Sequence, residues 1–209
     1  MTYSQRDFEK AAENIINIGR ILYQRGWTPA TSSNFSQRLD GRYCAITVSG
    51  KDKGNLTIED VMVVDLEGIP QTPQKPSAET LLHTSLYAWD SSIGAVLHTH
   101  SLHSNLISCL CQGNRWRLQG YELLKAFAGI DTHETVVDFP IFDNSQDIPQ
   151  LAKQVREYLE RGIPCWGYLI RKHGVYTWGR DMAEALRHLE AIEYLMECEL
   201  ELMRLKGVT

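Results

Sequence analysis

The chain has 209 residues, of which 43% are hydrophobic and 22% are charged, with a formal net charge of −5. This composition suits one globular domain with a sizeable core. No cluster of lysines and arginines stands out, so we expect no nucleic acid partner, because phosphate contacts need a basic face. The first ten residues contain no apolar signal core, and no run approaches the roughly 20 apolar residues of a membrane helix. We therefore expect a cytoplasmic protein with no membrane partner.

The cysteines also indicate a reducing compartment. They number five, Cys44, Cys109, Cys111, Cys165 and Cys198, and no two form a Cys-x-x-Cys pair. An odd number without that spacing argues against a disulfide framework or a zinc ribbon. Reduced thiols in a cytosol fit this pattern best.

In chain order, the first expected element is a helix. Ser4 and Asp7 resemble a capping box, and Gly26 ends the apolar stripe that follows. A polar stretch of small residues occupies 28–36. Strands are expected over 43–48 and 61–66, separated by a donor-rich turn at 49–54. Ser77 is expected to cap a helix that runs to about Trp89.

The second half alternates strands with helices. Strands are expected over 93–98, 135–139, 165–171 and 175–178, and helices from 101, over 122–126, over 149–161 and over 181–206. No repeat or linker interrupts this order, which predicts one mixed α/β domain over residues 1–209. Some strands follow each other directly and others are separated by helices, so we expect a mixed sheet. Periodicity leaves the strand order open.

Two histidines at the end of the strand expected over 93–98 are the strongest chemical signal. His98 and His100 are spaced i, i+2 and therefore share one face of a strand. A third histidine, His173, lies in another strand-and-turn segment. Three imidazoles with an open fourth position are typical of a catalytic zinc site. His83, His103 and His133 receive no ligand role, and we expect His188 to form a surface pair with Glu184.

Eight short motifs occur in register along the chain. They are Arg25–Thr31 with Ser33–Ser36, Ser49–Gly54, Lys75–Thr80 with His83, His98–His100, Gly120–Glu122, Phe142–Asn144, Lys172–Gly179 and Arg187–Glu190. With these motifs the chain resembles the class II, zinc-dependent aldolase superfamily, whose members act on small phosphorylated sugars. The resemblance implies a three-layer α/β/α domain with a mixed central sheet, one zinc ion per subunit, and a cyclic homotetramer with active sites between subunits.

The resemblance also assigns catalytic groups. His98, His100 and His173 match the three metal ligands of the family. Glu122, in Gly120–Glu122, matches the acid/base of the dehydratases in the superfamily, whereas Glu79 matches the catalytic glutamate of the aldolase branch. We favour Glu122. Glu79 stays a secondary candidate that approaches or ligates the metal when substrate is absent.

Three loops match the positions that bind phosphate in the family. They contribute Ser33 and Asn34, Ser49 and Gly50, and Ser77, and Lys51 would add a charge. Backbone amides in tight loops, together with a helix N-terminus at Ser77, would make an anion site. The family usually has glycine at the position of Ser33, although the serine amide can still donate.

The implied reaction is loss of water from a 2-ketose phosphate with hydroxyls on C3 and C4. A bound zinc would act as a Lewis acid that makes the C3 proton acidic, a carboxylate would remove this proton, and an acid would protonate the departing C4 hydroxyl. Two alternatives stay open. An aldolase or 4-epimerase would share the metal and phosphate sites, but the Gly120–Glu122 motif disfavours it. A non-catalytic binding module of the same fold would not need the three histidines and two glutamates that are present.

Overall fold

The computed structural model describes residues 3–207, and one eight-stranded sheet organises them. The strands are β1 (Asn34–Arg38), β2 (Tyr43–Thr47), β3 (Val61–Asp65), β4 (Ala95–Thr99), β5 (Arg115–Gln119), β6 (Val136–Phe142), β7 (Gly167–Ile170) and β8 (Gly174–Gly179). They lie in the order β3-β2-β1-β4-β8-β7-β6-β5. Only the pair β6–β7 is parallel among these strands. The prediction of a mixed sheet is confirmed.

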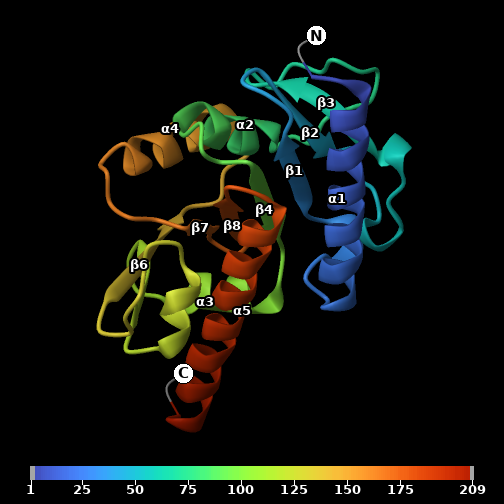
Figure 1. Cartoon of the computed structure of the whole chain (residues 1–209). Coiled ribbons are helices and arrows are strands. Elements are labelled where there is room, and N and C mark those ends of the chain that lie inside the picture. Colours follow the sequence, from blue (N-terminus) through green and yellow to red (C-terminus); the bar gives the residue numbers. More distant parts are fainter. Residues whose placement is uncertain (1–2, 208–209) are drawn as a thin grey trace.

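Helices cover both faces of this sheet (Figure 1). Helices α1 (Gln5–Gln24), α3 (Leu102–Leu110) and α5 (Met182–Leu205) pack on one face, and α2 (Thr80–Trp89) and α4 (Ile148–Leu159) pack together on the other. Each face has its own apolar core. Along β4, Leu97 points into the first core and Val96 into the second, as the alternation of a strand requires. The expected α/β/α layering is therefore present.

The longest predicted helices begin and end close to the expected residues. In α1, Ser4 Oγ accepts the amide of Asp7 at 3.2 Å, and Asp7 accepts the amide of Ser4 at 2.9 Å, so the capping box is confirmed. In α5, Asp181 caps the helix by accepting the amide of Glu184 at 2.8 Å. Both helices bury an apolar face against the sheet.

The start of α2 differs from the prediction. This helix begins at Thr80 with Glu79 as its N-cap, rather than at a cap on Ser77. The hydroxyl of Ser77 accepts the amide of Glu79 at 3.3 Å, so residues 77–79 form a turn before the helix. The helix expected over 122–126 is present as a short 3₁₀ helix.

Two strands do not follow from the hydrophobic pattern. β1 begins within the polar stretch 28–36, yet it lies in the middle of the sheet between β2 and β4. Its polar residues are buried because side-chain partners satisfy them: Ser36, for example, is fully buried and contacts His83 and Tyr87. β5 is an edge strand that alternates exposed and buried residues. Among residues 3–207, no helix is both long and apolar enough to cross a bilayer.

Candidate metal centre and active site

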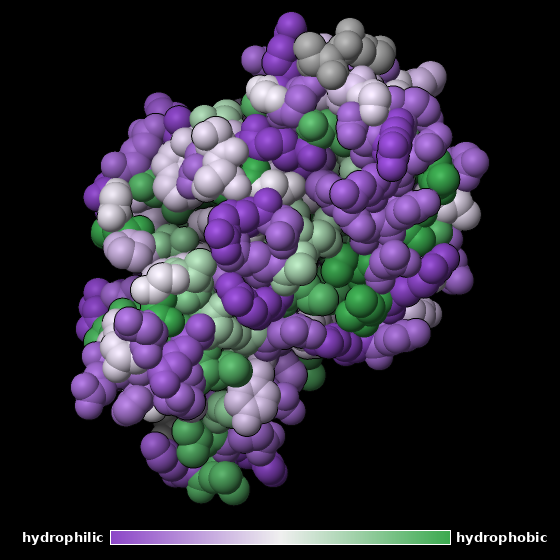
Figure 2. Space-filling model, in the orientation of Figure 1, coloured by the Kyte–Doolittle hydropathy of each residue, from purple (hydrophilic) through white to green (hydrophobic). Residues whose placement is uncertain are grey.

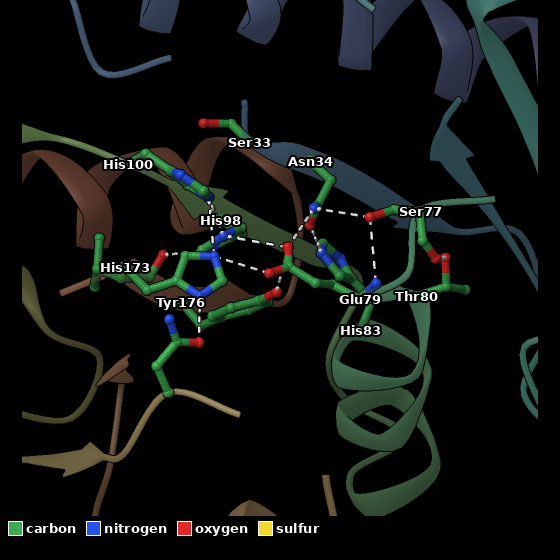
Figure 3. Close-up of polar contacts among 12 residues, drawn as sticks. Ser33, Asn34, Ser77, Glu79, Thr80, His83, His98, His100, His173 and Tyr176 are labelled. Carbon is green, nitrogen blue, oxygen red and sulfur yellow. Dashed lines mark hydrogen bonds and ion pairs between the residues drawn. The ribbon is translucent and has the colours of Figure 1, made fainter. Parts of the chain in front are cut away.

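Four side chains from three parts of the chain converge at the end of β4 (Figure 3). Glu79, His98, His100 and His173 each offer a ligand atom, and these atoms lie within 4.8 Å of one another. The Nε2 atoms of His98 and His100 are 2.7 Å apart, and those of His100 and His173 are 3.2 Å apart. Glu79 Oε1 lies 2.8 Å from His173 Nε2. The structure thus brings together the three histidines expected from the sequence and Glu79, the carboxylate expected to approach the metal.

Strand pairing explains how residues so distant in sequence meet. β4 and β8 are antiparallel neighbours, so His173, just before β8, lies beside the end of β4. The two strands approach closely at Gly174, where an added Cβ would lie 2.1 Å from the carbonyl oxygen of Thr99. A side chain there would push the strands apart. Gly174 therefore allows the approach that puts the third imidazole into the cluster.

The outer nitrogens of two imidazoles fix their tautomers. His98 Nδ1 donates to the carbonyl of Val175 at 3.0 Å, and His173 Nδ1 donates to Asn144 Oδ1 at 3.3 Å. Each of these rings therefore turns an Nε2 lone pair toward the centre. Lone pairs at such short separations repel one another unless a cation lies between them. This donor set fits a divalent metal ion.

Burial sets the charge of the cluster. It lowers the pKa of His98 well below its ordinary value and that of His100 to about 4, so both rings are neutral at pH 7. Burial alone would raise the pKa of Glu79, but its polar contacts, among them the hydrogen bond from Asn34, outweigh burial and hold that pKa well below normal. Neutral imidazoles beside a carboxylate are typical ligands of zinc and similar metals.

Two further residues hold the Glu79 carboxylate. Asn34 Nδ2 donates to Glu79 Oε2 at 2.8 Å, and the Tyr176 hydroxyl donates to the same oxygen at 3.3 Å. Tyr176 also stacks on the His98 ring, with centroids 4.0 Å apart. The sequence motifs alone assign no role to Tyr176. Its register opposite His98 in the β4–β8 pair is the feature that places it here.

The three loops expected to bind phosphate meet next to this cluster. The Ser49 amide donates to the carbonyl of Lys75 at 3.3 Å, and Asn34 Nδ2 lies 3.4 Å from the Ser77 hydroxyl. Ser33 has a φ of 75°, a left-handed conformation that favours glycine. Ser49 and Gly50 are exposed to solvent. The loops therefore form a polar border beside Glu79.

The two lysines of the turn 49–54 have different surroundings. Lys51 is half-exposed and pairs with Asp60 at 2.8 Å. Lys53 is buried, and its ammonium donates to the carbonyls of Lys51 at 2.6 Å and Thr31 at 3.2 Å. Burial lowers the pKa of Lys53 to about 8. Lys53 therefore ties two of the phosphate loops together, a role that the sequence did not indicate.

Glu122 lies apart from the cluster. Its side chain is 72% exposed and pairs with Lys125 at 2.6 Å and His133 at 3.5 Å. It borders an open cavity of about 1050 Å³ that Trp27 and other residues line. Within residues 3–207 of one chain, the metal-binding group does not include Glu122.

The prediction for His188 is wrong. His188 is only 2% exposed, and both ring nitrogens have partners inside the protein. Nδ1 donates to the carbonyl of Trp178 at 2.7 Å, and Nε2 accepts the amide of Ala128 at 3.2 Å. The i, i+4 spacing from Glu184 indicates a helical neighbour but not which face is buried. Glu184 pairs instead with Arg180 at 2.8 Å.

Comparison with known proteins gives a consistent result. The family described as Class II Aldolase and Adducin N-terminal domain matches residues 13–200. A protein of Pseudomonas aeruginosa named methylthioribulose-1-phosphate dehydratase is 57% identical over 198 residues, covering 94% of this chain and 97% of that protein. One of the same name from Xanthomonas campestris is 56% identical over 209 residues, covering 99% and 96%.

Solved structures agree on the fold. The L-fuculose-1-phosphate aldolase of Thermus thermophilus superposes with a TM-score of 0.74 at 25% identity, covering 95% of this chain and 96% of that one. The YgbL protein of Klebsiella pneumoniae superposes with a TM-score of 0.80 at 22% identity, covering 93% and 90%. The resemblance seen in the eight motifs therefore extends over nearly the whole chain.

Proposed function

The chain belongs to the class II aldolase and adducin N-terminal domain family, and from this premise we propose that it dehydrates 5-methylthioribulose 1-phosphate. The products are 5-methylthio-2,3-dioxopentyl phosphate and water. The activity is that of a methylthioribulose-1-phosphate dehydratase, a carbon–oxygen lyase of methionine salvage. The observation that carries this proposal is the convergence of Glu79 and three histidines in a chain 57% identical to a protein of that name.

We assign the metal ligands to the four converging side chains. Glu79, His98, His100 and His173 would hold one zinc ion per subunit, which when bound supplies Lewis-acid polarisation of the substrate carbonyl at C2. The ligand imidazoles are pre-oriented by Val175 and Asn144. Glu79 is the ligand that carries a negative charge, and Asn34 holds it from behind.

The reaction needs one proton removed and one delivered. The proton leaves C3, the C4 hydroxyl departs as water after protonation, and the resulting enol becomes the C3 ketone. We assign this acid/base work to Glu122. Its exposure in one chain supports delivery to the metal site of a neighbouring subunit rather than of its own. The polar border formed by Ser33, Asn34, Ser49, Gly50 and Ser77 would hold the phosphate, with Lys51 at its rim.

Exposed apolar side chains support assembly of the chain into a homotetramer. Leu102, Leu106 and Leu110 follow one another at helical spacing on α3, and each is at least 41% exposed. Hydrophobic side chains also gather at the C-terminal end of α5 (Figure 2), where Leu205 is 75% exposed. Such patches are typical of protein–protein interfaces. A cytoplasmic location fits the free thiols of all five cysteines.

A metal analysis followed by a turnover assay tests the proposal. The purified protein is expected to contain zinc and to convert methylthioribulose phosphate to the diketone with release of water. Fuculose 1-phosphate serves as the comparison substrate, and its cleavage to an aldehyde and a triose phosphate would indicate the aldolase alternative. A zinc-loaded protein that turns over fuculose 1-phosphate but not methylthioribulose phosphate would overturn the proposal.

A further inference from the structure

A file of buried polar side chains runs behind Glu79, between β1 and α2. The Tyr87 hydroxyl lies 2.8 Å from Ser36 Oγ, and Ser36 Oγ lies 2.8 Å from His83 Nδ1. His83 Nε2 makes a short contact with Asn34 Oδ1, and Asn34 Nδ2 donates to Glu79 Oε2 at 2.8 Å. His83 and Ser36 are fully buried, and Asn34 and Tyr87 nearly so. These four hydrogen bonds form one chain that ends at Glu79 in the metal site.

Two regular elements supply these side chains. Glu79, His83 and Tyr87 are spaced i, i+4 and i+8 at the start and along one face of α2. Asn34 and Ser36 are spaced i, i+2 and share one face of β1. The two sets meet behind Glu79, and Figure 3 shows Asn34 and His83 next to Glu79. Rigid elements on both sides therefore hold the file.

The direction of every hydrogen bond follows from the last member. An ionised carboxylate only accepts, so the Asn34 amide must turn its NH₂ group toward Glu79 and its oxygen toward His83. His83 Nε2 must then carry the proton, which leaves Nδ1 as an acceptor for the Ser36 hydroxyl. Ser36 in turn accepts from Tyr87. All donors point toward Glu79.

We propose that His83 is a positioning residue of the metal site, which fixes the Asn34 amide through this ordered file and thereby holds the Glu79 carboxylate toward the metal. This inference rests on the proposed function, because that function makes Glu79 a metal ligand. Aligned hydrogen bonds in a buried environment strengthen one another. Without His83, Asn34 is free to rotate its amide and present its oxygen to the carboxylate, which would repel it.

Tyr176 gives His83 a second connection to the same carboxylate. The His83 ring packs edge-on against the Tyr176 ring, with centroids 5.5 Å apart. The Tyr176 hydroxyl donates to Glu79 Oε2, the oxygen that Asn34 also contacts. His83 therefore contacts both groups that hold this oxygen, whereas Oε1 faces His173.

The tautomer of His83 is the first test. The side-chain nitrogen resonances of the ¹⁵N-histidine-labelled, zinc-loaded protein are recorded at neutral pH, and those of His83 are identified by their loss in His83→Phe or, should that variant not fold, in His83→Gln. The proposal requires a proton on Nε2 and a hydrogen-bonded, unprotonated Nδ1. A proton on Nδ1, or on both nitrogens, would overturn it. This measurement does not use the substrate, so it is independent of the dehydratase proposal.

Zinc affinity, measured by competition with a chelator, is the second test. We expect His83→Phe to weaken zinc binding by about 10–100-fold, as substitutions of residues that orient a metal ligand do. Ser36→Ala, which removes the two hydrogen bonds of the file that involve the Ser36 hydroxyl, should weaken it by about 2–10-fold. Thr84→Val is the matched control, because the buried Thr84 hydroxyl neighbours His83 in α2 and has no hydrogen-bond partner.

The control separates positioning from general stability. All three substitutions change a buried polar group, so each of them can lower the melting temperature. Only those in the file should change the affinity for zinc. Equal zinc affinity in Ser36→Ala and Thr84→Val, with Ser36→Ala folded, would contradict the proposal even if His83→Phe does not fold.

Discussion

At the scale of single residues, the chemistry of the site depends on pairs of atoms that the fold brings within hydrogen-bond distance. His98 is fully buried, yet its Nδ1 has a carbonyl partner and its Nε2 faces other ligand atoms. A buried polar group without a partner would cost stability. His98 is therefore stable in the core because its Nδ1 donates to a backbone carbonyl and its Nε2 faces the other ligand atoms.

The three histidines should be indispensable to metal binding. We expect His98→Ala and His173→Ala each to weaken zinc binding strongly. The effect should exceed the roughly 10–100-fold loss that follows substitution of a residue that orients a metal ligand. Zinc content by plasma emission spectroscopy checks this expectation. The exposed His133 provides the control, since His133→Ala should keep its zinc. Full zinc occupancy in His173→Ala would remove that residue from the site.

The two glutamates should have separable effects. Glu122→Gln cannot exchange a proton, so kcat should fall by about 10²–10⁴-fold while zinc stays bound. Glu79→Gln removes the charged ligand, so its main effect should be weaker zinc binding. Measuring kcat and zinc content in both variants decides between the roles. Near-normal turnover in Glu122→Gln beside a zinc-loaded but inactive Glu79→Gln would reverse the two assignments.

At the scale of elements, loops and helix ends carry the functional groups while the sheet holds them in place. The loop before β1 contains three non-glycine residues with positive φ, Ala30, Thr31 and Ser33. Such conformations are strained and persist only where the surroundings hold them. Lys53 is part of that support, because its ammonium binds the carbonyl of Thr31.

Removal of the Lys53 ammonium should therefore loosen the phosphate loops. We expect Lys53→Met to raise KM for the phosphorylated substrate about tenfold, which corresponds to the loss of a hydrogen bond to a charged group. Lys51→Met should have a smaller effect, because Lys51 is half-exposed and pairs with Asp60. Steady-state kinetics on both variants provide the measurement. A larger rise in KM for Lys51→Met would point to direct phosphate binding by Lys51 instead.

The start of α5 should give a pH-dependent contribution to stability. Hydrogen bonds from Arg180 outweigh burial and lower the pKa of Glu184 from 4.5 to about 2. The carboxylate is thus ionised more readily in the folded chain, and its contribution is complete above pH 4.5 and is lost as pH falls toward 2. Because Arg180 is largely exposed, we expect Glu184→Gln to cost only about 1 kcal/mol at pH 7.

Denaturant unfolding of the metal-free proteins at pH 7 and pH 3 measures this contribution. The difference between the original chain and Glu184→Gln should shrink at the lower pH. Glu157→Gln serves as the control, because Glu157 is exposed and lies 3.9 Å from Lys153 on α4. A difference that grows as the pH falls would contradict the sign of the pKa shift.

At the scale of the whole molecule, the proposed assignments predict that one subunit is not sufficient. The proposed metal ligands lie at the end of β4, whereas Glu122 is exposed and borders an open cavity. In a ring of identical subunits, the same surface pair repeats at each interface. Glu122 of one subunit would then complete the site of the next.

Mixed oligomers test this arrangement. Co-expressed His98→Ala and Glu122→Gln chains are inactive alone, but a random one-to-one ring should recover about one quarter of the sites, since each such site takes histidines from one chain and Glu122 from the other. The activity of the mixture, with subunit composition checked by mass spectrometry, is the measurement. A mixture that contains both chains and stays inactive would show that Glu122 does not act between subunits.

The sequence by itself determined the parts that depend on local spacing. Periodicity and capping predicted α1, α4 and α5 closely, and the i, i+2 rule put His98 and His100 on one face of a strand. The motifs identified the family and with it the expected ligands. These features survive without tertiary information because each is encoded within a few consecutive residues.

Only the tertiary structure decided which distant residues meet. The order β1-β4-β8 puts Asn34, His98 and Tyr176 side by side, although they lie far apart in the sequence. β1 was missed because its buried polar residues gain stability from partners in α2, not from an apolar pattern. The exposure of Glu122 depends on how its 3₁₀ helix packs against α5, and the burial of His188 depends on which face of α5 meets the sheet. Pairing and packing between remote segments set these outcomes, and local periodicity does not encode them.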